Sequence, residues 1–497
     1  MTACDPPQIL ECEQERLANS GLIQPWGALL FIDRQSGVFS YVSANSGSVL
    51  GEDPRALLGQ DGRDWLEQYL PELVDLPTNA GTRVHRIGAL DLGRGALDVL
   101  ICPTSAGWFL EFEPTIPDEG DPRAHQLLSL QPPLAAAKIQ QLQQSLVEVV
   151  SAVTGYDRVM LYQFHPDWSG EVLAETVQAS KGTYLGLRFP ASDIPAIARG
   201  LYAQSPYRHI PDAVAAPIAL LGLGGEGAAL DLSRSDLRSV SPVHVQYLQN
   251  MNVRSSFSVS VIVQGKLWGL IACHHPEPMS ISLQSRLRCK DLAGSFAETL
   301  QGLRKTAQRA IFEALTDCLA PVKASVAQGA VLPEALAGAF PTLARLFGAS
   351  SGALVIDNAL SLFGELQDPA TLETLRQWCL RNQGEPVFAL DYLPEPLRRA
   401  LGTGGDPIHG VLSVGLRAKT LDNALVSIYL LRPEEAGEIA WGGNPEKPLE
   451  STPDGQRLSP RHSFDKWVQV RHGYSRAWDQ DCLFAAHQLR EQLMAWL

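Results

Sequence analysis

The chain has 497 residues, 45% hydrophobic and 19% charged, a composition that predicts a folded protein of about three domains. Its 54 acidic residues outnumber 40 basic ones, which argues against nucleic-acid or anionic-membrane partners, and no apolar run reaches the roughly 18 residues of a membrane span. The eight cysteines form no C-x-x-C pair and no signal peptide opens the chain, so we expect a cytoplasmic protein with reduced thiols, no metal site and no disulfides.

The first segment, from about residue 20 to 115, carries short alternating apolar runs. Two of them are residues 28–32 and 108–112, and turn residues separate the runs. This texture is typical of an α+β domain with an antiparallel sheet. The stretch from Glu113 to Pro133 is rich in Pro, Asp and Gly, which predicts a linker.

The second segment opens on a predicted helix. Apolar residues spaced three and four apart run from Ile139 to Val153, and Gly155 stands at the expected C-cap. Strand-like runs follow at residues 158–164, 256–263 and 267–272. We therefore expect a second α+β domain.

A further helical pattern runs from Leu283 to about Leu319. As a single helix it would be about 55 Å long, which favours a connection between two domains or a pairing with its copy in a dimer. The alternative is two ordinary helices with a break near Gly302.

The third segment, roughly residues 320–497, again has an α+β pattern. Its stretch 441–467 is poor in core residues and bracketed by tryptophans, and so long a patternless stretch is typical of a functional or disordered segment. The last predicted element is a helix over residues 482–497, with no catalytic domain after it, so we expect no enzymatic activity.

One nucleotide-binding motif occurs as a string, Gly222-x-Gly224-x-x-Gly227. The dinucleotide site needs a strand that leads directly into a helix N-terminus. The motif lies in a glycine-rich run, and Asp231 and Ser233 follow where a packed helix should begin, so a loop is the better interpretation. A nicotinamide enzyme is a rival that we do not favour.

A set of polar residues between 190 and 275 indicates a ligand site. Asp193 stands between Pro190 and Pro195, which stiffen its backbone. Guanidinium groups bind carboxylates with two hydrogen bonds, and residues two apart on a strand share a face. The set could therefore hold carboxylates, although its spacing alone names no ligand: Arg208, Arg238, His244, Ser256 and Ser258.

Five motifs resemble those of bacterial phytochromes. They are Gly155-Tyr-Asp-Arg-Val-Met160, Pro190–Pro195, Leu237-Arg-Ser-Val-Ser-Pro-Val-His244, Trp268-Gly-Leu-Ile-Ala-Cys-His-His275 and Pro460-Arg-His-Ser-Phe464. The resemblance covers essentially the whole chain. It implies an N-terminal segment over 1–20, a PAS domain over 21–118, a GAF domain over 134–300, and a PHY domain over 315–497. It also implies a figure-of-eight knot between PAS and GAF.

The resemblance implies biliverdin IXα as the chromophore. Cys12, in Cys-Glu-Gln-Glu before Gly21-Leu-Ile-Gln-Pro-Trp-Gly27, is similar to the family cysteine that forms a thioether with ring A. Plant-type phytochromes carry their attaching cysteine just before the central histidine. That position is Val243 here, which cannot form the bond.

The same resemblance implies a role for each further site residue. The backbone carbonyl of Asp193 would accept from the pyrrole N–H groups, and His244 would contact them through water. Arg208 and Arg238 would bind one propionate, with Tyr202 nearby. Ser256, Ser258 and His244 would bind the other. His274 would hydrogen-bond the ring D carbonyl, inside a cage made by Met160, Tyr162, Phe189 and Tyr247.

The implied function is a red/far-red photoreceptor that switches between the Pr and Pfr states. Light would isomerise the double bond between rings C and D, and a PHY tongue, about residues 436–475, would refold from strand to helix. Trp441, Arg461 and Ser463 are the implied switch residues, with Arg461 and Ser463 pairing in turn with Asp193. The implied partners are a second copy of the chain and a downstream output kinase domain or response regulator. The rival function is a GAF-type regulator that binds a small molecule without photochemistry.

Overall fold

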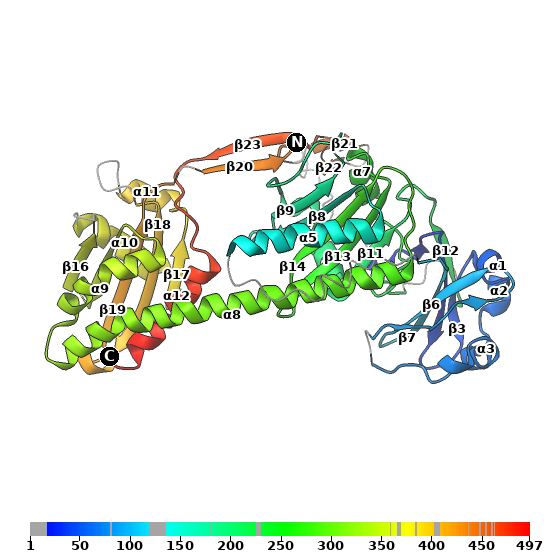
Figure 1. The fold of residues 1–497 in the computed structure, drawn as a ribbon, viewed down its shortest axis with the longest axis horizontal. Helices are drawn as coiled ribbons and strands as arrows, with labels where there is room; N and C mark the ends of the chain where they lie inside the picture. Colours follow the sequence, from blue (N-terminus) through cyan, green and yellow to red (C-terminus); the bar gives the residue numbers. More distant parts are fainter. Residues whose placement is uncertain are drawn as a thin grey trace, which may run out of the picture. The chain divides into compact units, whose positions relative to one another are not determined.

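The computed structural model contains three large sheets, in agreement with the α+β class predicted from the sequence. The chain forms two compact units, Met1–Gln301 with Ala440–Trp467, and Gly302–Ile439 with Val468–Leu497. The first sheet belongs to the first unit and the third to the second (Figure 1). The second sheet belongs to the first unit except for residues 437–439 and 468–471 of its last two strands. The structure describes residues 17–79, 82–118, 136–178, 180–224, 230–357, 359–364, 369–382, 385–401, 408–435, 437–446, 449–452, 455–458, 461 and 463–497.

The first sheet has the order β1-β12-β3-β2-β7-β6-β4, with β5 also paired to β6. Its strands are β1 (Leu22–Ile23), β2 (Ala28–Asp33), β3 (Phe39–Ser43), β4 (Val84–His85), β5 (Leu90–Asp91), β6 (Ala96–Pro103), β7 (Gly107–Pro114) and β12 (Ile218–Gly222). The helices of this part are η2 (Leu17–Asn19), α1 (Ser46–Val49), α2 (Pro54–Leu57), α3 (Gly62–Tyr69) and η3 (Pro71–Leu73). Trp65 and Leu66 of α3 pack into the core against Leu30 and Leu110 of the sheet. Strand β7 extends through Glu113 and Pro114, so regular structure continues into the predicted linker.

Strand β12 brings residues of the second predicted domain into the first sheet. It lies between β1 and β3, with Ala219 opposite Leu22 and Leu220 opposite Ser43. No helix follows it within the described residues 230–241, so the dinucleotide motif lacks its required context there. The knot depends on residues 1–16 and 225–229, which lie outside the described residues, and it stays a prediction.

The second sheet has the order β11-β13-β14-β8-β9-β10-β20-β23. Its strands are β8 (Arg158–Phe164), β9 (Gly170–Val177), β10 (Arg188–Phe189), β11 (Tyr207–Ile210), β13 (Ser255–Val263), β14 (Lys266–His275), β20 (Gly437–Gly442) and β23 (Lys466–Arg471). Helices α5 (Ala136–Thr154) and α8 (Leu283–Ala327) pack on one face (Figure 1). The predicted helix and the three predicted strands are confirmed, and Gly155 follows α5 with the positive φ of +71° that a C-cap needs.

Helix α8 is one continuous helix of 45 residues. Leu292 and Phe296 in its first part pack into the core of the second sheet, and Leu315 and Leu319 in its later part pack into the core of the third. The alternative of two helices with a break near Gly302 is therefore wrong.

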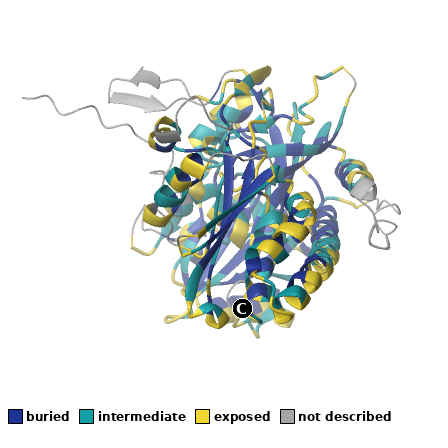
Figure 2. Cartoon of the chain, turned by 90° about the vertical axis from the view of Figure 1, so that its left-hand side faces the viewer, coloured by how far each residue is buried: buried dark blue, intermediate teal, exposed yellow. Residues whose placement is uncertain are grey.

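The second unit contains the third sheet, with the order β16-β15-β19-β18-β17. The strands are β15 (Ser351–Ile356), β16 (Ala359–Gly364), β17 (Val387–Leu390), β18 (Gly410–Ala418) and β19 (Ala424–Arg432). The helices are α9 (Leu332–Phe347), α10 (Pro369–Asn382), α11 (Glu395–Leu401), η5 (Lys419–Leu421) and α12 (Gln480–Met494). In Figure 2 the central strands are coloured as buried and the outward sides of the helices as exposed. Among the described residues, no helix combines the length and apolar character that crossing a membrane requires.

The segment predicted as a tongue consists of strands. β20 and β23 pair at one end, and β21 (Leu449–Thr452) and β22 (Gly455–Leu458) form a two-stranded hairpin. The Gly443 amide donates to the Asp465 carbonyl at 2.8 Å, which holds the two arms together. Gly443 has a φ of +91°, and a Cβ atom there would lie 2.1 Å from the Ser463 carbonyl oxygen, so only glycine fits.

Candidate functional site

The floor of the candidate site is one face of the second sheet. Arg208 on β11 lies opposite Ser258 on β13, and Ser256 lies opposite His274 on β14. Because side chains alternate along a strand, these four residues share one face. The intervening Phe257 faces the other way, into the core beneath α5 and α8.

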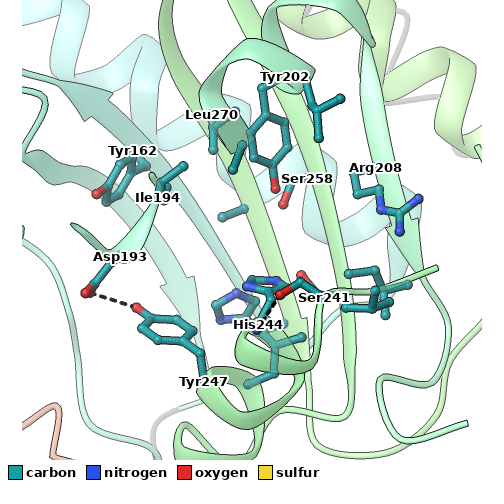
Figure 3. Close-up of a pocket in the computed structure, with 18 of the residues that line it drawn as sticks. Tyr162, Asp193, Ile194, Tyr202, Arg208, Ser241, His244, Tyr247, Ser258 and Leu270 are labelled. Carbon is teal, nitrogen blue, oxygen red and sulfur yellow. Dashed lines mark hydrogen bonds between the residues drawn. The ribbon is translucent and has the colours of Figure 1, made fainter. Parts of the chain in front are cut away.

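One pocket over this floor brings together twelve of the site residues predicted from the sequence. Figure 3 labels some of them, among them Asp193, Arg208 and His244. The walls come from a loop containing η4 (Ala191–Asp193), and from helices α6 (Ala196–Gln204) and α7 (Pro242–Asn250). The twelve residues are Met160, Tyr162, Phe189, Asp193, Tyr202, Arg208, Arg238, His244, Tyr247, Ser256, Ser258 and His274. Cys12, the thirteenth predicted ligand, lies outside the described residues.

Two arginines give the pocket its positive charge. Arg208 donates to the carbonyl oxygens of Asp236 at 3.1 Å and Ser239 at 3.0 Å, and to that of Arg238. Burial and the neighbouring charge of Arg238 lower the pKa of Arg208 to about 9. The Arg238 Nε is buried without a hydrogen-bond partner, and in the described part of the chain neither arginine has an ion pair. The pair is therefore suited to an anionic ligand group.

Two histidines in the pocket are neutral at pH 7. Burial, with the charges of Arg208 and Arg238, lowers the pKa of His244 to about 4. Burial and the charge of Arg158 lower the pKa of His274 to about 3, and the His274 Nδ1 has no hydrogen-bond partner within the described residues. A neutral imidazole offers one donor and one acceptor, so each ring can bind an uncharged polar group of a ligand.

Aromatic side chains form the opposite end of the pocket. Tyr162 and Phe189 have ring centroids 6.1 Å apart, and Tyr247 stacks on His244 at the same distance. Gly170 makes room for this arrangement, because a Cβ atom there would lie only 1.8 Å from the Tyr162 ring. This end can enclose a flat apolar group.

An ion pair from the tongue closes the site. Asp193 pairs with Arg461, and the side chain of each is only 2% exposed. The Asp193 Oδ2 also accepts from the Tyr247 hydroxyl at 3.1 Å, as Figure 3 shows. The Asn250 amide at the end of α7 donates to the Arg461 carbonyl at 3.0 Å, a contact that the sequence analysis missed. The tongue is thus tied to two walls of the pocket.

The two other predicted switch residues, Trp441 and Ser463, lie on the same tongue but make different contacts. Trp441 is buried opposite Arg188, in the parallel pair of β10 and β20. Ser463 is exposed, and its hydroxyl donates to the Asp465 carboxylate at 3.2 Å. In this structure Arg461, and not Ser463, is therefore the tongue partner of Asp193.

A buried carboxyl beneath the pocket carries an unusual charge state. Glu111 on β7 accepts from the Asp236 amide at 3.1 Å and from the Ser235 hydroxyl. Burial and the charge of Asp236 raise the pKa of Glu111 to about 8, against an ordinary value of 4.5. Glu111 therefore holds a proton at neutral pH.

We expect Glu111→Gln to flatten part of the pH dependence of stability. Because the pKa of Glu111 is higher in the folded state, the protonated carboxyl adds to the stability of the wild type. This contribution is fully present below pH 4.5 and is lost as the pH rises towards 8. Relative to the wild type, the unfolding free energy of the variant, measured by denaturant titration, should rise by roughly 3–4 kcal/mol between pH 5 and pH 8. A constant difference over that range would contradict the assignment. Glu67→Gln, at an exposed helix position, is the control.

Comparisons with known proteins identify three domains. Family models match as the PAS fold over residues 12–114, the GAF domain over 138–300 and the phytochrome region over 317–497. A bacteriophytochrome of Pseudomonas aeruginosa is 34% identical, over 99% of this chain and 67% of its own length. A bacteriophytochrome of Xanthomonas campestris is 31% identical, over 98% of this chain and 79% of its own length.

The solved structures agree with the sequence comparisons. The phytochrome photosensory core module of Stigmatella aurantiaca is 29% identical, with a TM-score of 0.81 over 99% of this chain and 98% of that one. The chain spans about two thirds of the length of the first curated relatives that it matches. The chain therefore belongs to the phytochrome family of red/far-red photoreceptors, with the PAS, GAF and PHY domains of a bacteriophytochrome photosensory module.

Proposed function

We propose that this chain senses red and far-red light through biliverdin, bound in the GAF pocket and attached to Cys12 by a thioether. The observation that carries the proposal is the half-buried pair Arg208 and Arg238 in the pocket, which has no ion pair in the described part of the chain. Biliverdin carries two propionates, which are carboxylates of the kind that buried arginines bind.

The residues of the pocket fit the polar groups of this chromophore. Arg208 and Arg238 would hold one propionate, with Tyr202 beside them. Ser256, Ser258 and His244 would hold the second, since the two serine hydroxyls share the floor with Arg208. The unpartnered Nδ1 of His274 supports a role for this ring in binding the ring D carbonyl.

The bound chromophore would supply the light-driven isomerisation of the double bond between rings C and D. The protein residues orient it and sense the change. The Asp193 carbonyl would accept from the pyrrole N–H groups, the neutral His244 would contact them through water, and Met160, Tyr162, Phe189 and Tyr247 would enclose ring D.

The tongue would convert that local change into a larger one. Asp193 and Tyr247 line the pocket and also contact each other, and Asp193 contacts Arg461. A new arrangement of the residues around ring D would therefore disturb the ion pair between Asp193 and Arg461, which holds the tongue in its strand form. Release of Arg461, with Ser463 taking its place, would give the two-state element that a switch between Pr and Pfr requires.

The signal would leave through helix α8 towards an output module. The continuous helix belongs to the cores of both the second and the third sheet, which makes it the natural route. We propose a homodimer that controls a kinase domain or a response regulator, with no catalysis by these three domains themselves.

Assembly with biliverdin tests this function. The purified apoprotein mixed with biliverdin should give a far-red absorption band that shifts reversibly under red and far-red light. No far-red band would overturn the proposal. A band without photoconversion would favour a GAF-type binding protein instead.

A further inference from the structure

The segment from Arg234 to Ser239 lies between the PAS domain and the chromophore pocket. On the pocket side, its carbonyl oxygens at Asp236, Arg238 and Ser239 accept hydrogen bonds from the Arg208 guanidinium. The position of Arg208 therefore depends on where this segment places its backbone.

The PAS domain holds the segment with two side chains, the guanidinium of Arg83 and the buried carboxyl of Glu111. Arg83 pairs with the Asp236 carboxylate and donates to the Arg234 carbonyl at 3.2 Å. Glu111 accepts from the Asp236 amide at 3.1 Å and from the Ser235 hydroxyl. Both the side chain and the amide of Asp236 are thus bound by PAS residues, while its carbonyl binds Arg208.

The N-terminal strand fixes the other half of the segment. The Gln24 amide donates to the Leu237 carbonyl at 2.6 Å, and the Ser239 amide donates to the Leu22 carbonyl at 3.1 Å. Leu237 is fully buried in a cluster with Ile23 and Leu29. The segment is therefore anchored at nearly every residue from the PAS side.

This anchoring matters because the positive charge of Arg208 is electrostatically unfavourable where it lies. Its guanidinium is buried beside the like charge of Arg238. The carbonyl oxygens of the segment offset that repulsion, and they do so only at hydrogen-bond distance.

We propose that Arg83 and Glu111 of the PAS domain are positioning residues for the propionate site, setting the preference of the GAF pocket for a ligand with ionised carboxylates. They act through the segment and never touch the ligand. This inference rests on the proposed function, since it assumes that Arg208 binds a propionate of biliverdin.

The test compares biliverdin with its dimethyl ester, which lacks both carboxylate charges. The dissociation constants of the two are measured on the apoprotein in the Cys12→Ser background, where no thioether forms, by quenching of tryptophan fluorescence. Their ratio reports the effect of removing the carboxylate charges. In Arg83→Met and Glu111→Leu the ratio of the two dissociation constants should fall about tenfold towards one. A tenfold change corresponds to the loss of one charge-assisted hydrogen bond to the propionate. Arg83→Lys and Glu111→Gln should restore much of it.

A matched control lies at the same interface. Glu113 on β7 and Arg286 on α8 form an equally buried ion pair that makes no hydrogen bond to the segment. The double variant Glu113→Gln with Arg286→Met should keep the wild-type ratio. Circular dichroism melting curves confirm that each variant is folded.

The outcomes separate the two proposals. A wild type that binds neither compound contradicts the proposed function. A wild type that prefers biliverdin, with folded Arg83→Met and Glu111→Leu variants that keep the full preference, overturns the inference alone. The inference is also overturned if the control variant loses the preference for biliverdin as strongly as Arg83→Met and Glu111→Leu do. Any loosening of the interface would then have the same effect.

Discussion

A Cys12→Ser variant is expected to lose covalent chromophore completely while still binding biliverdin in the pocket. A serine hydroxyl does not ionise at neutral pH, whereas a thiolate is a strong nucleophile towards the vinyl-derived side chain. Zinc-induced fluorescence of the bilin on a denaturing gel measures the adduct directly. It should disappear in this variant, and the absorption band of the native protein should remain.

The other cysteines in the described part of the chain are poor substitutes for Cys12. None of the six lines the pocket, and five are buried. Burial raises the pKa of Cys102 to about 11 and that of Cys289 to about 12. Cys273 precedes His274 on β14 but points into the core, where burial raises its pKa well above 9.

Cys4 is therefore the proper control for Cys12. Cys4→Ser should keep the full fluorescent band, and a band that survives in Cys12→Ser but is lost in Cys4→Ser would move the attachment to Cys4. Val243 lines the pocket at the position where plant-type phytochromes attach their chromophore. The variant Val243→Cys in the Cys12→Ser background tests whether a thiol in the pocket can replace Cys12 as the site of attachment.

An Arg461→Ala variant is expected to free the tongue from the pocket. Arg461 and Asp193 are both 2% exposed, and removal of one partner leaves an uncompensated buried charge, which costs about 3–5 kcal/mol in comparable pairs. Amide hydrogen exchange over residues 440–467 should accelerate strongly in the dark-adapted holoprotein. Dark reversion after illumination should also change its rate, because one photostate loses its anchor.

Lys466→Ala is the matched control, since Lys466 is an exposed cation on the same tongue. Unchanged exchange and unchanged reversion in Arg461→Ala would remove the ion pair from the mechanism. The double variant Arg461→Ala with Asp193→Asn, compared with both single variants, gives the coupling energy. If the double variant exchanges its amide hydrogens over residues 440–467 more slowly than Arg461→Ala does, the charge of the Asp193 carboxylate is what destabilises the tongue in Arg461→Ala.

The local structure of the core was predictable because it depends on periodicity within one segment. The strand run at 158–164 and the helix ending at Gly155 follow from alternation, three-and-four spacing and a glycine C-cap, and the structure confirms them. The site residues followed from short motifs and the resemblance that they carry. The pocket brings twelve of them together, while their roles towards the chromophore stay predictions.

The contacts that tie the pocket to its neighbours were not predictable in this way. Asn250 donates to Arg461, and Arg83 pairs with Asp236, across separations of 211 and 153 residues. No local pattern specifies such partners. One feature of the sequence does indicate such a contact. Glu111 interrupts the apolar run from Trp108 to Phe112, and an acid at a buried strand position needs a hydrogen-bond partner.

The insertion of β12 between β1 and β3 affects how this protein is made. The ribosome releases Phe39–Ser43 long before Ile218–Gly222 is synthesised, so β3 must wait with an open edge for most of the GAF domain. Pairings so distant in sequence form slowly, since the loop must close before the contact stabilises it. The PAS domain therefore cannot complete its fold as an independent unit during translation, and its final strand arrives only with residues of the GAF domain.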